Sequence, residues 1–188
     1  IADRAKLPET TAMPSRLTRW QHRKTAQTAT QKPRTFEGQT LFAKVDSIYD
    51  GDTITIATRL KGEQFWLYKL RLLGLDTPEI RPSRDLPNRE SHKAASRLVK
   101  ERLTAKIPPG SVIVVVFAKE GKYGRLLGTA YTTRRFFGSY YKNKNINRWL
   151  IDSGYALPYD GGTKTVFSQA FLDRVLGPGG ARTVVTTV

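Results

Sequence analysis

The feature that most constrains the fold is a succession of β-prone runs joined by very short turns. Residues 41–48 are mostly apolar and lead into Asp50-Gly51, a dipeptide that favours a tight turn. Residues 53–58 alternate and are rich in β-branched side chains, as expected for a returning strand. A further turn at Lys61-Gly62 leads into residues 65–75, a third run with an irregularity near its end. The sequence therefore predicts three consecutive strands.

The rest of the chain adds one clear helix, two strands and two shorter helices. Residues 90–105 carry apolar side chains at helical spacing, so they are expected to form the best-defined helix. Residues 112–117 and 125–132 read as strands, and residues 145–153 and 165–176 as helices. This order predicts an α+β, mainly β, domain: a five-stranded closed barrel with about three helices. Periodicity alone does not separate this barrel from another α+β fold.

The two ends differ from this central domain, which is expected over residues 39–176. Residues 1–38 predict an extended basic arm, because six basic residues and no acid lie between Glu9 and Glu37. One interpretation is an arm that touches nucleic acid or a protein partner; an equally weighted one is a linker or the remnant of a targeting sequence. Residues 177–188 are expected to form a C-terminal tail.

The charge balance points to polyanionic partners. The chain has 32 Lys and Arg against 16 Asp and Glu, a formal net charge of +16 at pH 7. Such an excess favours nucleic acid first and an anionic membrane surface second, and no apolar run approaches a membrane span, so no membrane insertion is expected. The absence of cysteine excludes disulfides and thiolate metal sites. Two histidines, His22 and His92, disfavour a zinc site, and His92 is expected at the surface.

Two aspartates are placed where strand ends can bring them together. Asp52 follows the first turn, and Asp76 follows the third strand. Two unpaired carboxylates in contact repel each other, so their expected shared role is to hold a cation, and oxygen ligands suit Ca²⁺ or Mg²⁺. Thr77 can add its backbone carbonyl, and Glu79 can orient or deprotonate a water molecule. Taken singly, these segments are also compatible with an ordinary turn and a helix-capping stretch.

Two arginines flank the same motifs. Arg71 precedes Asp76 on the third strand, and Arg125 follows a Lys-Tyr-Gly turn. Each can bind phosphate oxygens and stabilise the charge that develops during attack on phosphorus. Carboxylates and arginines in one site predict an enzyme that cuts phosphodiester bonds.

Residues 134–144 form an aromatic and basic segment with two interpretations. Its four rings, with nearby Arg134, Arg135 and Lys142, can stack on bases and hold a nucleic-acid strand. The same rings can pack the last helices onto the barrel, and packing is expected for at least two of them. The rings are Phe136, Phe137, Tyr140 and Tyr141.

The motifs resemble a known family. Asp50-Gly51-Asp52-Thr53, the segment from Arg71 to Glu79 and Lys122-Tyr123-Gly124-Arg125 look like the signature of the thermonuclease family, whose type member is staphylococcal nuclease. The resemblance covers roughly residues 39–164, with the motifs in the family's order. It departs at Gly121, where many members carry an acid. Residues 145–164 look most like members from phages and large DNA viruses.

The resemblance implies an OB-fold barrel and Ca²⁺-dependent cleavage of DNA, RNA or both. It implies a calcium site at Asp52, Asp76 and Thr77, and catalytic roles for Arg71, Glu79 and Arg125. It also implies substrate contacts from the following residues: Lys122, Tyr123 and Tyr159.

A rival hypothesis is a structural or binding subunit of a larger assembly, such as a virion, that is built on the nuclease fold. The arm and the tail are then the expected contacts with protein partners. The sequence does not indicate a compartment; virion association and secretion both fit these readings.

Overall fold

The structure is a computed structural model, and it describes residues 35–118, 125–162 and 166–177. Most of the expected arm and tail, together with Lys122 and Tyr123, lies outside the described residues. Phe36 is buried, with its ring 4.9 Å from that of Tyr68 and 5.0 Å from that of Phe117. The last residues of the expected arm therefore contribute to the core.

The main sheet is built from six strands in the order β3-β2-β1-β5-β6-β7. Neighbours in this order pair antiparallel, and β1 carries an irregularity between Val45 and Ser47 that bends the strand. The strands are β1 (Thr40–Ile48), β2 (Thr53–Thr58), β3 (Trp66–Leu72), β5 (Val112–Phe117), β6 (Leu126–Phe136) and β7 (Ser139–Asn145).

A parallel pairing between β3 and β6 closes five of these strands into a ring. In its register Leu70 lies opposite Leu126 and Leu72 opposite Gly128. β7 is outside the ring and pairs with β6. The ring, with three described helices, confirms the predicted mainly β, OB-type fold with about three helices.

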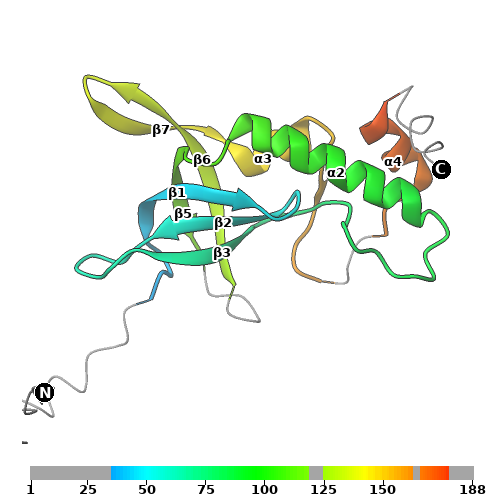
Figure 1. Cartoon of the computed structure of the whole chain (residues 1–188), viewed down its shortest axis with the longest axis horizontal. Helices are drawn as coiled ribbons and strands as arrows, with labels where there is room; N and C mark the ends of the chain where they lie inside the picture. Colours follow the sequence, from blue (N-terminus) through cyan, green and yellow to red (C-terminus); the bar gives the residue numbers. More distant parts are fainter. Residues whose placement is uncertain (1–34, 119–124, 163–165, 178–188) are drawn as a thin grey trace, which may run out of the picture. The chain divides into compact units, whose positions relative to one another are not determined.

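The core fills the ring and continues under the helices. α2 (Arg89–Lys106) places Ala95, Val99 and Leu103 against the strands, because these residues recur on one helical face. α4 (Gln169–Leu176) packs beside α2, and α3 (Ile146–Asp152) follows β7 directly and packs against β6 (Figure 1). Among the described helices, none combines the length and the apolar character that spanning a bilayer requires.

Two expectations about side chains were wrong. His92 was expected at the surface, but it is only 5% exposed, because it lies on the α2 face that meets Phe167, with the rings 5.7 Å apart. Burial lowers the pKa of His92 below its usual 6.5.

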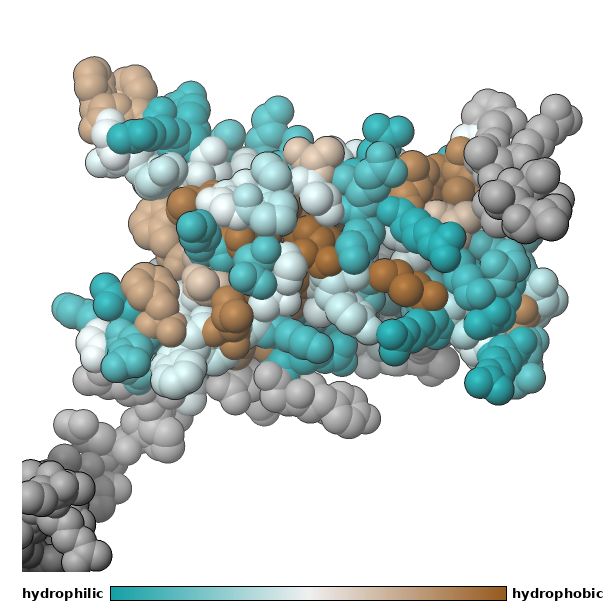
Figure 2. Space-filling model, in the orientation of Figure 1, coloured by the Kyte–Doolittle hydropathy of each residue, from teal (hydrophilic) through white to brown (hydrophobic). Residues whose placement is uncertain are grey.

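The four aromatic residues between 136 and 141 do not pack the last helices onto the barrel either. They belong to the β6–β7 hairpin, in which Arg135 pairs with Tyr140, and all four rings remain between 44% and 91% exposed. Figure 2 shows hydrophobic atoms exposed at the tip of this hairpin, where Phe136 and Phe137 lie. The hairpin extends the sheet beyond the ring, and the ring contacts of these residues are between Phe136 and Phe137 and between Tyr140 and Phe42 of β1.

Candidate active site

The first part of the site is the turn before β2. Asp52 is 5% exposed, and its Oδ1 accepts a hydrogen bond of 2.7 Å from the hydroxyl of Thr53. The backbone N–H of Asp52 donates to Asp50 Oδ1 at 3.4 Å. Thr53 therefore orients the Asp52 carboxylate, and Asp50 holds the backbone of the turn.

Gly51 allows the turn to pack tightly against the rest of the site. A Cβ atom at this position would lie 2.6 Å from Cγ1 of Val99 and 2.8 Å from Oγ1 of Thr77, both too close for any side chain. From the sequence, the expected role of Gly51 is to allow a tight turn. The structure shows that close approach to α2 and to Thr77 is an additional reason.

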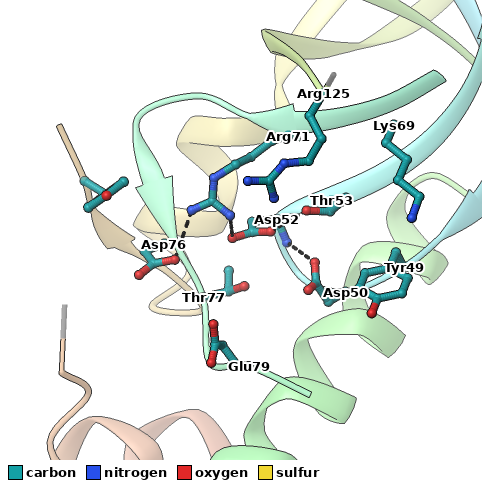
Figure 3. Close-up of a pocket in the computed structure, with 11 residues that line it drawn as sticks. Tyr49, Asp50, Asp52, Thr53, Lys69, Arg71, Asp76, Thr77, Glu79 and Arg125 are labelled. Carbon is teal, nitrogen blue, oxygen red and sulfur yellow. Dashed lines mark hydrogen bonds and ion pairs between the residues drawn. The ribbon is translucent and has the colours of Figure 1, made fainter. Parts of the chain in front are cut away.

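Arg71 and Asp76 come from the end of β3 and the short strand that follows. Gly74, with a φ of 81°, reverses the chain in a conformation that favours glycine. β4 (Leu75–Asp76) then pairs with β8 (Leu157–Pro158), which fixes the direction of the Asp76 side chain. Nη2 of Arg71 donates to Oδ1 of Asp76 at 3.1 Å, and Nη1 donates to Oδ2 of Asp52. One guanidinium thus joins the two carboxylates (Figure 3).

The electrostatics of this cluster depend on burial. The Asp52 and Asp76 side chains are 6% and 2% exposed, whereas that of Arg71 is 20% exposed. Burial alone would lower the pKa of Arg71, but the charges of Asp52 and Asp76 more than offset it and raise that pKa. Asp76 Oδ2 is buried without a hydrogen-bond partner in the described structure. An unsatisfied buried carboxylate oxygen is an available ligand position.

Arg125 joins the site through the closure of the ring. It directly precedes β6, and the parallel pairing places Arg71 opposite Leu127. Both arginines therefore reach the same mouth of the barrel. They line one cavity of about 490 Å³ (Figure 3), together with Asp52, Asp76, Thr77, Glu79 and Tyr159.

The remaining predicted residues flank this cavity. Thr77 is 2% exposed, and Glu79 lies two residues further along the same segment. Tyr159 is held from two sides: its hydroxyl donates to the carbonyl of Gly162 at 2.7 Å, and its ring centre is 5.9 Å from the Arg71 guanidinium carbon. Its backbone N–H donates to the carbonyl of Gly74, which ties this segment to the loop before Asp76.

The cavity also contains residues to which the sequence analysis gave no role. Lys69 lies two residues before Arg71 in β3, and its Nζ is 5.2 Å from the ring centre of Tyr49. Residues two apart in a strand point to the same face, so the sequence carried a signal that Lys69 lies beside Arg71. Burial, followed by the charge of Asp52, raises the pKa of the Asp50 carboxyl from 3.8 to about 7.

Asn147 of α3 supports the site from behind. Its Nδ2 donates to the carbonyl of Leu73 at 2.8 Å and to that of Gly128 at 3.2 Å, and its Oδ1 accepts from the N–H of Ala130. It therefore joins the end of β3, which carries Arg71, to β6, which begins directly after Arg125. A single polar residue in a short helix offered no sequence signal for this role.

The donor atoms fit a hard cation. Asp52 and Asp76 offer carboxylate oxygens, Thr77 a carbonyl oxygen, and the unpartnered Asp76 Oδ2 is free of competing hydrogen bonds in the described structure. Within the described residues there is no group of three or more His, Cys, Asp or Glu side chains arranged for a metal ion. A cation held by Asp52 and Asp76 would take its remaining ligands from backbone oxygens or water.

The comparisons with known proteins agree with this arrangement. Residues 69–170 match the family model described as staphylococcal nuclease homologue, a segment that contains Arg71, Asp76, Glu79, Arg125 and Tyr159. The chain is also 32% identical over 128 residues to the succinoglycan biosynthesis protein ExoI of Rhizobium meliloti (strain 1021). That match covers 66% of this chain and 56% of the relative, so the chain spans little more than half of the relative's length.

Proposed function

The chain belongs to the staphylococcal nuclease homologue family, and from this premise we propose that it is a metal-dependent nuclease that hydrolyses phosphodiester bonds of DNA, RNA or both. The observation that carries the proposal is the single cavity lined by two arginines, two buried aspartates and Glu79. A site that only binds nucleic acid gains nothing from carboxylates facing a phosphate.

Each residue has a chemical task in this proposal. Asp52, Asp76 and the carbonyl of Thr77 would hold Ca²⁺, which supplies positive charge beside the scissile phosphate. Glu79 accepts the proton of the attacking water. Arg71 and Arg125 donate hydrogen bonds to the phosphate oxygens and stabilise the added negative charge of the transition state.

Tyr159 is proposed to contact the substrate beside Arg71, and Lys122 and Tyr123 are proposed as further substrate contacts. Internal cleavage and cleavage from an end are both compatible with this proposal. The phage or viral origin suggested by residues 145–164 stays a prediction from the sequence.

A second candidate is a binding or structural subunit built on the same fold. The exposed aromatic hairpin of β6 and β7 favours it, because exposed rings commonly mark interaction surfaces. The name of the bacterial relative refers to succinoglycan biosynthesis rather than to nuclease activity, which is also compatible with this candidate.

Digestion of plasmid DNA and single-stranded RNA with Ca²⁺, Mg²⁺ or a chelator separates the two candidates. We expect cleavage with Ca²⁺ and none with chelator. Glu79→Gln and Arg125→Ala should each lower turnover by at least ~100-fold while the melting curve is retained. Matched controls are Glu101→Gln and Arg148→Ala, two exposed positions on α2 and α3 that should leave turnover unchanged. Absence of cleavage by the folded wild type under every condition would favour the binding subunit.

A further inference from the structure

A second cavity, of about 590 Å³, lies on the outer face of the sheet. It is formed mainly by β1, β2 and the segment that connects β2 to β3, and we call it the outer groove. Among its described lining residues two are basic, Lys44 and Arg59, and none is acidic.

Strand alternation in β1 explains why Phe42 is exposed in the groove, whereas Phe65 lies in the segment that connects β2 to β3. Ala43 and Val45 point into the core, so Phe42 and Lys44 point outward. Phe42 is 53% exposed and Phe65 is 62% exposed. Large rings with this exposure are available to a ligand.

Aromatic and basic side chains lie together along the groove and its margin. Phe42 contacts Tyr140 of β7, with ring centres 6.5 Å apart, and the register continues from Phe42 through Val114 to Tyr131. The Arg59 guanidinium carbon lies 4.6 Å from the Phe65 ring centre. At the far end of the row, Lys142 Nζ lies 4.5 Å from the Tyr131 ring centre. Rings and cations thus occur in pairs across the outer face.

We propose that the outer groove binds single-stranded nucleic acid. The exposed rings provide faces on which unpaired bases stack, and the adjacent cations meet the phosphates. An apolar protein partner would have to bury Lys44 and Arg59 without a counter-charge, which is costly. The net charge of +16 favours a polyanion over such a partner.

The groove and the active-site cavity are connected by β2. This strand begins at Thr53, which lines the active-site cavity, and ends beside Arg59, which lines the groove. At about 3.3 Å per residue the two positions are roughly 20 Å apart. A nucleic-acid strand bound in the groove would therefore be held close to the site of cleavage, while its end remains free to enter the active-site cavity. The inference deepens the proposed function by giving the substrate a second contact surface outside the active-site cavity, and its use in cleavage rests on that function.

Binding is measured without turnover, in the presence of chelator. The probe is a fluorescein-labelled oligothymidylate of about 16 nucleotides, the upper end of what such a barrel covers, beside an abasic strand of the same length. We expect wild type to bind the oligothymidylate more tightly than the abasic strand. In Phe42→Ala and Phe65→Ala, affinity for the oligothymidylate should fall at least about fivefold for each ring that stacks on a base. Val166→Ala, which removes apolar surface at a 79% exposed position outside the groove, is the matched control and should leave affinity unchanged.

Equal binding of both strands by wild type, or equal loss in Val166→Ala, would overturn the proposal. Unchanged affinity in both folded groove variants would also overturn it and would leave the groove for a protein partner. Failure of Ca²⁺-dependent cleavage would affect the proposed function but not this binding result.

Discussion

Replacing Arg71 with methionine should strongly destabilise the protein when no metal is present. The guanidinium is the shared partner of two almost fully buried carboxylates. The Asp52 and Asp76 side chains are only 6% and 2% exposed. Methionine preserves much of the volume and removes the charge and the donors. Asp52 keeps the hydroxyl of Thr53 at 2.7 Å, whereas Asp76 loses the hydrogen bond of 3.1 Å at Oδ1, and its Oδ2 has no partner in the described structure.

The expected loss follows from leaving buried charges uncompensated. Removing one partner of a buried ion pair costs about 3–5 kcal/mol. For a chain of this length each kcal/mol lowers the melting temperature by about 2–4 °C, so Arg71→Met should melt roughly 6–20 °C below wild type. Arg71→Lys keeps the charge but loses the bidentate geometry of the guanidinium. Its melting temperature should therefore lie between those of Arg71→Met and wild type.

The measurement is urea and thermal unfolding at neutral pH in chelator. A triple variant, Arg71→Met with Asp52→Asn and Asp76→Asn, removes the buried charges and should recover most of the lost stability. If the two aspartates hold Ca²⁺, adding it should also stabilise Arg71→Met, by about 2.7 kcal/mol at a hundred times the dissociation constant. An unchanged midpoint in Arg71→Met, or a triple variant no more stable than Arg71→Met, would refute the reasoning.

Three further predictions concern other parts of the chain. Gly51→Ala should cost about 1–3 kcal/mol in unfolding experiments and lower turnover, because the added Cβ displaces Val99 and Thr77. The lowered pKa of His92 means that its neutral form stabilises the fold above pH 6.5 and that this contribution is lost as pH falls through the lowered value. Melting scans from about pH 7 to about pH 5 should show a smaller decline in His92→Leu than in wild type. A chain that starts at Thr35 and keeps Phe36 should bind DNA with a flatter salt dependence, by roughly one unit of slope per lost phosphate contact, at unchanged saturated turnover; equal slopes would show that the arm does not contact DNA.

Most of the secondary structure was determined by local sequence. Alternating β-branched residues, the Asp50-Gly51 turn and the apolar face of α2 each act over a few residues, so their elements form close to the predicted ranges. β7 was missed because its side chains are mostly exposed and polar or aromatic, without the alternating apolar face that marks a half-buried strand. The two-residue strands β4 and β8 are too short to leave a pattern.

The sequence by itself also determined which residue types make up the site, because their motifs occur in the family's order. Their arrangement was decided by tertiary structure. Arg71 and Arg125 share a cavity because β3 and β6 pair in parallel, a contact between segments more than fifty residues apart in the sequence. The burial of His92 and the formation of the outer groove were likewise decided by tertiary structure. Local patterns fix which way a side chain points from its own strand or helix, but closure of the ring and docking of the helices decide what that side chain meets.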